Sequence, residues 1–173
     1  MKRTAAIIAL LCLIITAFFG CAEGTGSDAM LHCTILIECK NAVACNELAA
    51  DQKELLPSDG MILTKTEIAF TDGESVYDML VRECRERGIH MEASYAPVYD
   101  SAYIEGIANL YEFDCGSLSG WTYCVNGVFP NYGCSNFKLS DGDEIEFHYS
   151  CDLGRDVGAV FEEYRGENQG YDE

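Results

Sequence analysis

The chain has 173 residues, of which 49% are hydrophobic, and a formal net charge of −18. This length is enough for one domain with a single core. The strong negative charge repels nucleic acid phosphates and anionic lipid headgroups, so nucleic acid is excluded as a partner.

Residues 1–20 predict a secretory signal. Lys2 and Arg3 form a basic start, and the apolar run at 4–19 is shorter than the roughly 20 residues of a membrane span. Gly20-Cys21 resembles the lipobox of bacterial lipoproteins, in which the cysteine becomes lipidated, although Phe18 stands where Leu is usual. We therefore expect a lipid anchor at Cys21 on the outer face of the cytoplasmic membrane. Ordinary secretion with a spare thiol, or an uncleaved anchor helix, are the alternatives.

The rest of the chain divides into three parts. Residues 21–29 are small, polar and glycine-bearing, as in a flexible tether. Residues 30–156 are the expected folded domain. Residues 157–173 form an acidic tail without enough apolar surface for a core.

Ten cysteines are the second signal in the composition. Without Cys12 and Cys21, an even number remains, which in an exported domain predicts a disulfide-rich fold. We expect the pair Cys115–Cys134 in particular, because these residues bracket a predicted hairpin. A metal site is the alternative, but no Cys-x-x-Cys pair is present and no residue is assigned as a metal ligand. The disulfide candidates are Cys33, Cys39, Cys45, Cys84, Cys115, Cys124, Cys134 and Cys151.

The first half of the domain predicts two antiparallel strands and a helix. Residues 31–39 and 61–70 are rich in β-branched residues, with a short helix over 41–50 and a turn at 57–60 between them. Ser75 and Asp78 form a capping box for a helix that ends at Gly88. Its apolar stripe comprises Val76, Met79, Leu80 and Cys84, and its solvent face comprises Arg82, Glu83, Arg85, Glu86 and Arg87.

The second half predicts further strands. Short strands at 89–95 and 103–107 flank a polar turn, and Asn126-Gly127 predicts a hairpin with a type I′ turn over 120–129. The last strand, at 144–149, alternates between apolar and polar residues. The order predicts an α+β fold of the β-grasp type: a mixed sheet packed on one main helix, with the first and last strands side by side.

Four segments together resemble the transcobalamin-like C-terminal domain family of Gram-positive surface proteins. They are 72–80 (DGESVYDML), 103–107 (YIEGI), 119–127 (SGWTYCVNG), and 131–134 (NYGC) followed by 139–146 (LSDGDEIE). The resemblance implies a β-grasp-like domain related to the small domain of cobalamin carriers, which covers one face of a corrinoid. This chain lacks the carriers' large helical domain and has more cysteines, so the fold alone does not establish the ligand.

The residues offer little for catalysis. The segment 116–120 (GSLSG) misses the Gly-x-Ser-x-Gly elbow, and His148 on a polar strand face is interpreted as a solvated residue. Aromatic residues around the predicted hairpin are better suited to binding a flat ligand or a protein partner. The candidate ligand-binding residues are Trp121, Tyr123, Asn126, Phe129, Asn131 and Tyr132.

The sequence therefore predicts a non-enzymatic ligand-binding lipoprotein on the cell surface, with cobalamin or another corrinoid as the candidate ligand. No other cofactor is assigned. The alternatives are an adhesion module that recognises an extracellular protein or glycan, and a structural metal-binding protein.

The anchor can be tested directly. Cys21→Ala should abolish lipidation and release the chain from membranes, because Cys21 is the residue that the lipobox resemblance assigns to the lipid. Fractionation with acyl-group mass spectrometry checks this. A Cys21→Ala protein that stays wholly in the membrane fraction would contradict the lipoprotein prediction.

Overall fold

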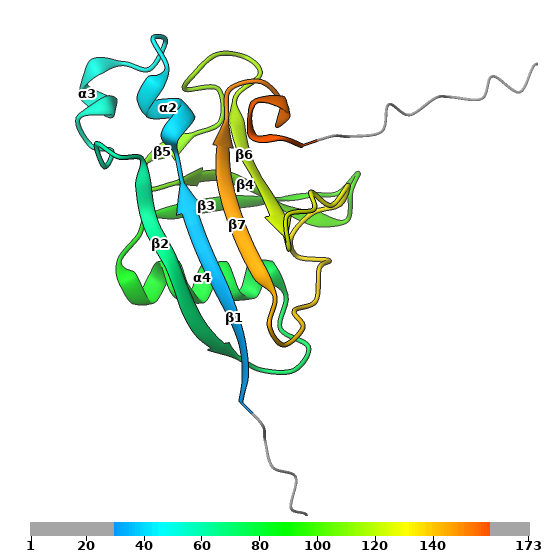
Figure 1. Ribbon diagram of the computed structural model, residues 1–173. Coiled ribbons are helices and arrows are strands. Elements are labelled where there is room, and N and C mark those ends of the chain that lie inside the picture. Colours follow the sequence, from blue (N-terminus) through cyan, green and yellow to red (C-terminus); the bar gives the residue numbers. More distant parts are fainter. Residues whose placement is uncertain (1–29, 160–173) are drawn as a thin grey trace, which may run out of the picture.

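The computed structural model describes residues 30–159 (Figure 1). The predicted signal at 1–20, Cys21, the tether up to residue 29 and the tail from residue 160 lie outside these residues. Within 30–159, no helix has both the length and the apolar character of a membrane span.

A four-stranded sheet forms the frame of the domain, in the order β2-β1-β7-β6. Its strands are β1 (Leu31–Glu38), β2 (Met61–Phe70), β6 (Gly120–Val125) and β7 (Glu144–Ser150). β1 pairs antiparallel with β2 and parallel with β7. The predicted adjacency of the first and last strands is confirmed.

The remaining strands make a second sheet instead of extending the first. β3 (Met91–Ala96), β4 (Ser101–Ile107) and β5 (Leu110–Tyr111) pair antiparallel in that order. Figure 1 shows β3 and β4 crossing behind the four-stranded sheet, on the side that also carries the main helix. The fold is α+β as predicted, but with two sheets in place of one.

The main helix, α4 (Val76–Arg87), begins and ends as its sequence predicts. Ser75 Oγ accepts from the Asp78 N–H, the Asp78 carboxylate accepts from the Ser75 N–H, and Gly88 adopts a left-handed φ of 68°. These contacts satisfy backbone groups that a helix leaves unpaired at its ends. The predicted apolar stripe is buried against the sheet.

Alternation along the strands divides the sheet into two faces. On β7, Ile145 and Phe147 are buried with Ile35 and Ile37 of β1 in the main core, and Tyr149 is buried in the smaller core. A smaller core lies at one end of the sheet, under α2 (Lys40–Ala44) and α3 (Ala50–Lys53). These two short helices replace the single one predicted over 41–50. The described chain ends after the 3-10 helix η1 (Arg155–Val157).

The predicted hairpin forms only its turn. Asn126 and Gly127 have φ values of 53° and 75°, the left-handed pair that a type I′ turn requires. Beyond the turn, Val128 makes one isolated bridge to Val125, and β6 pairs with β7 instead. Asn126 explains the choice, because its side chain bonds Asp143 and the backbone N–H of Glu144 and so fixes the turn to the start of β7.

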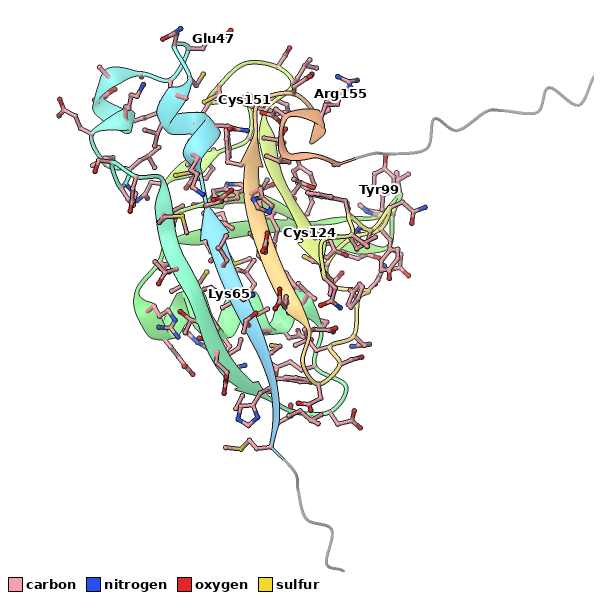
Figure 2. All side chains as sticks on the ribbon, viewed as in Figure 1. Glu47, Lys65, Tyr99, Cys124, Cys151 and Arg155 are labelled. Carbon is pink, nitrogen blue, oxygen red and sulfur yellow. The ribbon has the colours of Figure 1, made fainter. Side chains whose placement is uncertain are left out.

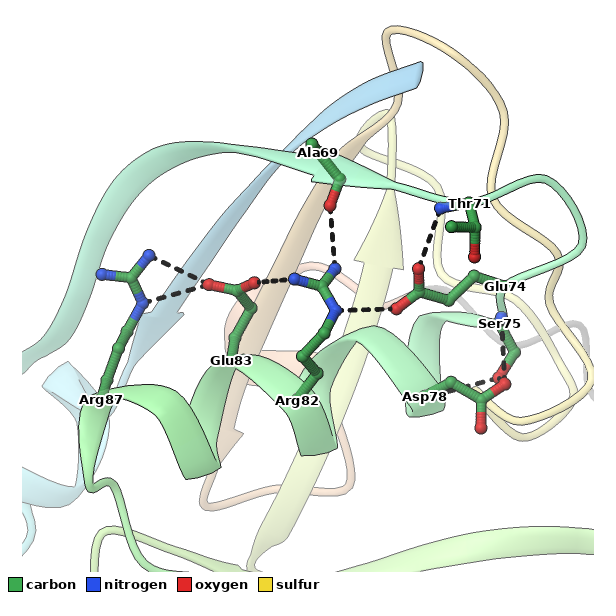
Figure 3. Close-up of polar contacts among 8 residues, drawn as sticks. All are labelled: Ala69, Thr71, Glu74, Ser75, Asp78, Arg82, Glu83 and Arg87. Carbon is green, nitrogen blue, oxygen red and sulfur yellow. Dashed lines mark hydrogen bonds and ion pairs between the residues drawn. The ribbon is translucent and has the colours of Figure 1, made fainter. Parts of the chain in front are cut away.

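One residue assigned to the solvent face of α4 is buried. Glu83 is only 3% exposed, and its carboxylate accepts from Arg82 Nη1 at 2.5 Å and from Arg87 Nη2 at 3.0 Å (Figure 3). Arg82 also bonds Glu74 and the carbonyl oxygen of Ala69 at the end of β2. Arg82 therefore links the buried carboxylate to β2, and Arg87 pairs with the same carboxylate from the last turn of the helix.

We predict that Glu83→Ala lowers the free energy of unfolding by about 3 kcal/mol, because it leaves two partly buried guanidinium groups without their shared anion. Glu86→Ala, at an exposed position on the same helix, is the matched control and should change it by less than about 0.5 kcal/mol. Urea unfolding of both variants measures the difference. Equal effects would show that the Glu83 contacts contribute no net stability.

Candidate functional site

The cysteines do not form the predicted disulfide framework. All eight cysteines within residues 30–159 are free thiols. The expected pair is separated, because Cys134 lies in the main core beneath α4 and Cys115 lies in the smaller core near α2. The prediction failed because the return strand that would bring their flanks together does not form.

Cys115 instead meets two other thiols. The Sγ atoms of Cys45, Cys115 and Cys151 lie within 4.8 Å of one another, and we call this group the three-thiol cluster. Figure 2 shows Cys151 at the end of the molecule that carries α2, close to Glu47. Three loops meet here, one after α2, one after β5 and one after β7.

The three thiols are not equivalent. Burial raises the pKa of Cys151 to about 11. Burial also acts to raise the pKa of Cys45, but a hydrogen bond with Cys115 and the backbone N–H groups of Glu47 and Leu48 outweigh it, so that this pKa is lowered. Cys45 is therefore the member most prone to become a thiolate.

A second cluster occupies the outer face of the four-stranded sheet, opposite α4. Cys124 of β6 is the register partner of Glu146 on β7, and His148 follows two residues later on the same face. Cys124 Sγ lies 3.8 Å from His148 Nε2 and 3.9 Å from Glu146 Oε2, and Nε2 lies 3.1 Å from Oε2. We call Cys124, Glu146 and His148 the sheet-face cluster; Figure 2 labels Cys124 at the middle of the sheet.

His148 is more enclosed than its sequence context predicted. Its side chain is 12% exposed, and Nδ1 lies 2.9 Å from Oε1 of Glu38, the residue directly beside it on β1. Glu38 in turn forms an ion pair with Lys40. Alternation alone placed His148 on a polar face, but only the parallel register with β1 reveals its carboxylate partner.

The third feature is a groove of about 720 Å³ between β4, β6 and the loop 130–134. Four predicted binding residues meet there: Trp121, Tyr123, Asn131 and Tyr132. Tyr99 and Tyr103, which the sequence analysis did not select, add two exposed rings from the β3–β4 side, and Figure 2 labels Tyr99 at that edge of the molecule. These two residues were hard to select from the sequence, because they come from the β3–β4 strand pair and lie far along the chain from the aromatic residues around the 120–129 turn.

Hydrogen bonds and stacking hold the groove in shape. Tyr123 donates its hydroxyl to the carbonyl oxygen of Tyr132 at 2.9 Å, and Trp121 donates its indole N–H to the carbonyl oxygen of Leu110 at 2.9 Å. Trp121 also packs edge-on against Tyr149, with ring centroids 5.3 Å apart. Gly133 lets the loop approach β4, because a Cβ there would collide with Ser101.

Two predicted binding residues lie elsewhere. Asn126 uses its side chain to hold the turn against β7. Phe129 packs against His148, with ring centroids 6.0 Å apart, on the outer face of the sheet. Neither lines the groove.

A shallower depression of about 450 Å³ continues from the groove beyond Trp121. Its rim carries Phe113, Leu118 and Leu153, which are 60%, 44% and 53% exposed. The two hollows share Tyr103, Trp121, Thr122 and Leu153, so they form one continuous, largely apolar face.

Comparison with known proteins gives a family without an assigned activity. Residues 73–151 match the family described as "Domain of unknown function (DUF4430)". The match covers α4 through β7, which includes two residues of the three-thiol cluster, Cys115 and Cys151, and every lining residue of the groove except Leu153. No curated protein matches the chain.

Two solved structures are similar in fold. One is a candidate metal-binding protein from Ruminococcus gnavus ATCC 29149, with 18% identity and a TM-score of 0.41 over 69% of this chain and 96% of that chain. The other is haptocorrin in complex with Cbi, with 13% identity and a TM-score of 0.47 over 70% of this chain and 26% of that chain. This chain thus spans about a quarter of haptocorrin.

We predict that mild oxidation joins Cys115 to Cys45 or Cys151, because only small movements separate these sulfur atoms from bonding distance. One thiol of the three must then remain free. Peptide mapping of the unreduced protein by mass spectrometry identifies the pair, and Cys134 serves as the internal control that should stay reduced. A Cys115–Cys134 peptide would contradict the arrangement described here.

Proposed function

We propose that this domain is a non-enzymatic ligand-binding module and that its groove takes the flat, uncharged face of a ligand. The observation that carries the proposal is the composition of the groove. None of the sixteen described residues that line it is Asp, Glu, His, Lys or Arg, although the chain as a whole has 29 acidic residues. A surface kept free of charge in so acidic a chain is suited to apolar and aromatic contact.

The ionisable groups of the groove favour binding over catalysis. Burial raises the pKa of Tyr123, and burial and the Glu112 carboxylate raise that of Tyr103. Burial also raises the pKa of the Cys134 thiol to about 12. All three groups are therefore neutral near pH 7, and the groove presents no poised acid, base or thiolate nucleophile.

A corrinoid is the ligand that we propose first. The motifs at 72–80, 103–107, 119–127 and 131–134 with 139–146 resemble those of the transcobalamin-like family, and the parallel pairing of β1 with β7 fits its β-grasp topology. The groove offers aromatic rings for the flat macrocycle and polar groups for peripheral amides, from Ser101, Thr122 and Asn131. A lipid anchor at Cys21 would hold such a module at the cell surface, where the ligand arrives.

A protein-binding module is the second proposal, and a specific observation supports it. The apolar face continues past Trp121 onto the exposed side chains of Phe113, Leu118 and Leu153. Contiguous exposed apolar surface of this kind marks interaction sites in soluble proteins.

The fluorescence of Trp121 can report ligand binding, because Trp121 lines the groove and is the only tryptophan of the chain. Titration with cobalamin or cobinamide should quench its fluorescence to saturation. Tyr132→Ala and Tyr99→Ala should each weaken binding about thirtyfold, the equivalent of about 2 kcal/mol for a lost stacking partner. Tyr99 is 75% and Tyr132 48% exposed, so neither substitution opens a cavity in the core and the melting temperature should change little.

Tyr95→Ala is the matched control, since Tyr95 is equally exposed but lies outside the groove. It should leave binding unchanged. No quenching of the wild-type chain at millimolar corrinoid would discard the corrinoid and favour the protein partner. Binding that survives both groove substitutions would move the ligand away from this groove.

A further inference from the structure

We infer that the sheet-face cluster is a binding site for a divalent ion of the zinc class, with Cys124 Sγ, His148 Nε2 and a Glu146 carboxylate oxygen as its protein ligands. This inference departs from the sequence analysis, which assigned no metal ligand. It is also independent of the groove, because none of the three residues lines it.

The spacing of the three ligand atoms fits one central ion. With metal–ligand bonds of about 2.3 Å to sulfur and about 2.0–2.2 Å to nitrogen and oxygen, a tetrahedral ion separates sulfur from either partner by about 3.6 Å and nitrogen from oxygen by about 3.4 Å. The corresponding distances here are 3.8, 3.9 and 3.1 Å. These distances therefore differ from the tetrahedral geometry by about 0.2–0.3 Å, which a small rotation of the side chains removes.

Carboxylates lie at both ring nitrogens of His148, Glu38 at Nδ1 and Glu146 at Nε2, and this arrangement favours a positive group between His148 and Glu146. If His148 Nδ1 carries a proton and donates it to Glu38, the neutral ring turns the Nε2 lone pair towards the Glu146 carboxylate at 3.1 Å. Two acceptors this close repel each other unless a second proton or a metal ion lies between them. Cys124 Sγ adds a third ligand atom on the same side, 3.8 Å from His148 Nε2 and 3.9 Å from Glu146 Oε2, so that one metal ion could contact all three.

The surroundings resemble those of a built site. A carboxylate on the far nitrogen of a metal-binding histidine fixes the ring and its tautomer, and Glu38 occupies that position, itself held by Lys40. The three ligands come from adjacent strands in register, so the sheet holds them rigidly. Three protein ligands leave a fourth position for water or an external donor, as in zinc sites that bind an exchangeable ligand.

The test uses the full chain, kept reduced and free of metal by a chelator that is then removed. Zn²⁺ should bind with a stoichiometric equivalent that remains after dialysis, measured by elemental analysis. Co²⁺ should give a sulfur-to-metal charge-transfer band of the strength expected for one thiolate. Cys124→Ser should abolish that band, and His148→Gln should weaken binding at least tenfold.

Three further variants make the result specific. Glu38→Gln should weaken metal binding about 10–100-fold without removing a ligand, as loss of a supporting carboxylate does. His90→Gln is the matched histidine control. His90 Nε2 also lies 3.1 Å from a carboxylate oxygen, that of Glu92, but His90 belongs to neither of the two cysteine-containing clusters of the described residues. Cys151→Ser disables the three-thiol cluster and should leave the one-thiolate band intact.

Two outcomes would overturn the inference. Metal lost in Cys151→Ser but kept in Cys124→Ser would assign the ion to the three-thiol cluster. No retained metal in a wild-type chain that is folded by circular dichroism would show that a proton alone bridges His148 and Glu146. Neither result bears on corrinoid binding, which is measured separately at the groove.

Discussion

The parallel pairing of β1 with β7 is the constraint on which the rest of the structure depends. Parallel neighbours cannot be joined by a tight turn, so the chain must make a long crossover between them. The crossover here holds α4, the second sheet and β6. It covers one face of the four-stranded sheet with α4 and leaves the other face open, which separates the core from the sheet-face cluster.

The register of β1 against β7 also decides which side chains of the two strands lie side by side. In this register Glu38 lies beside His148, and Ile37 lies beside Phe147 in the core. Because side chains alternate along a strand, a slip of one residue would turn Glu38 away from His148 and bring charged groups into the core. The buried positions of β7 therefore hold the histidine in place, although their side chains lie on the other face of the sheet.

The sequence predicted local structure well where short-range chemistry decides it. The capping box of Ser75 and Asp78, the Gly88 end of α4 and the left-handed pair at Asn126-Gly127 each depend on residues within one turn. It failed where distant elements decide. Glu83 reads as a solvent residue until Arg82 and Arg87 enclose it against β2, and the strand expected after Asn126 is reduced to one bridge, between Val125 and Val128.

The cysteines show the same limit most clearly. In the sequence the eight cysteines of the domain form one group, and their even number predicts disulfides. The fold sorts them by environment: Cys33, Cys84 and Cys134 pack in the main core and Cys39 in the smaller core, Cys45, Cys115 and Cys151 meet as three thiols, and Cys124 faces a histidine and a carboxylate. Burial raises the pKa of Cys33 and Cys84 to about 11, which keeps these core thiols protonated near pH 7. Burial raises the pKa of Cys124 and Cys151 to the same value, so it is geometry that sets the two clusters apart: each brings three ligand atoms within 4.8 Å of one another, close enough for one metal ion to bridge them.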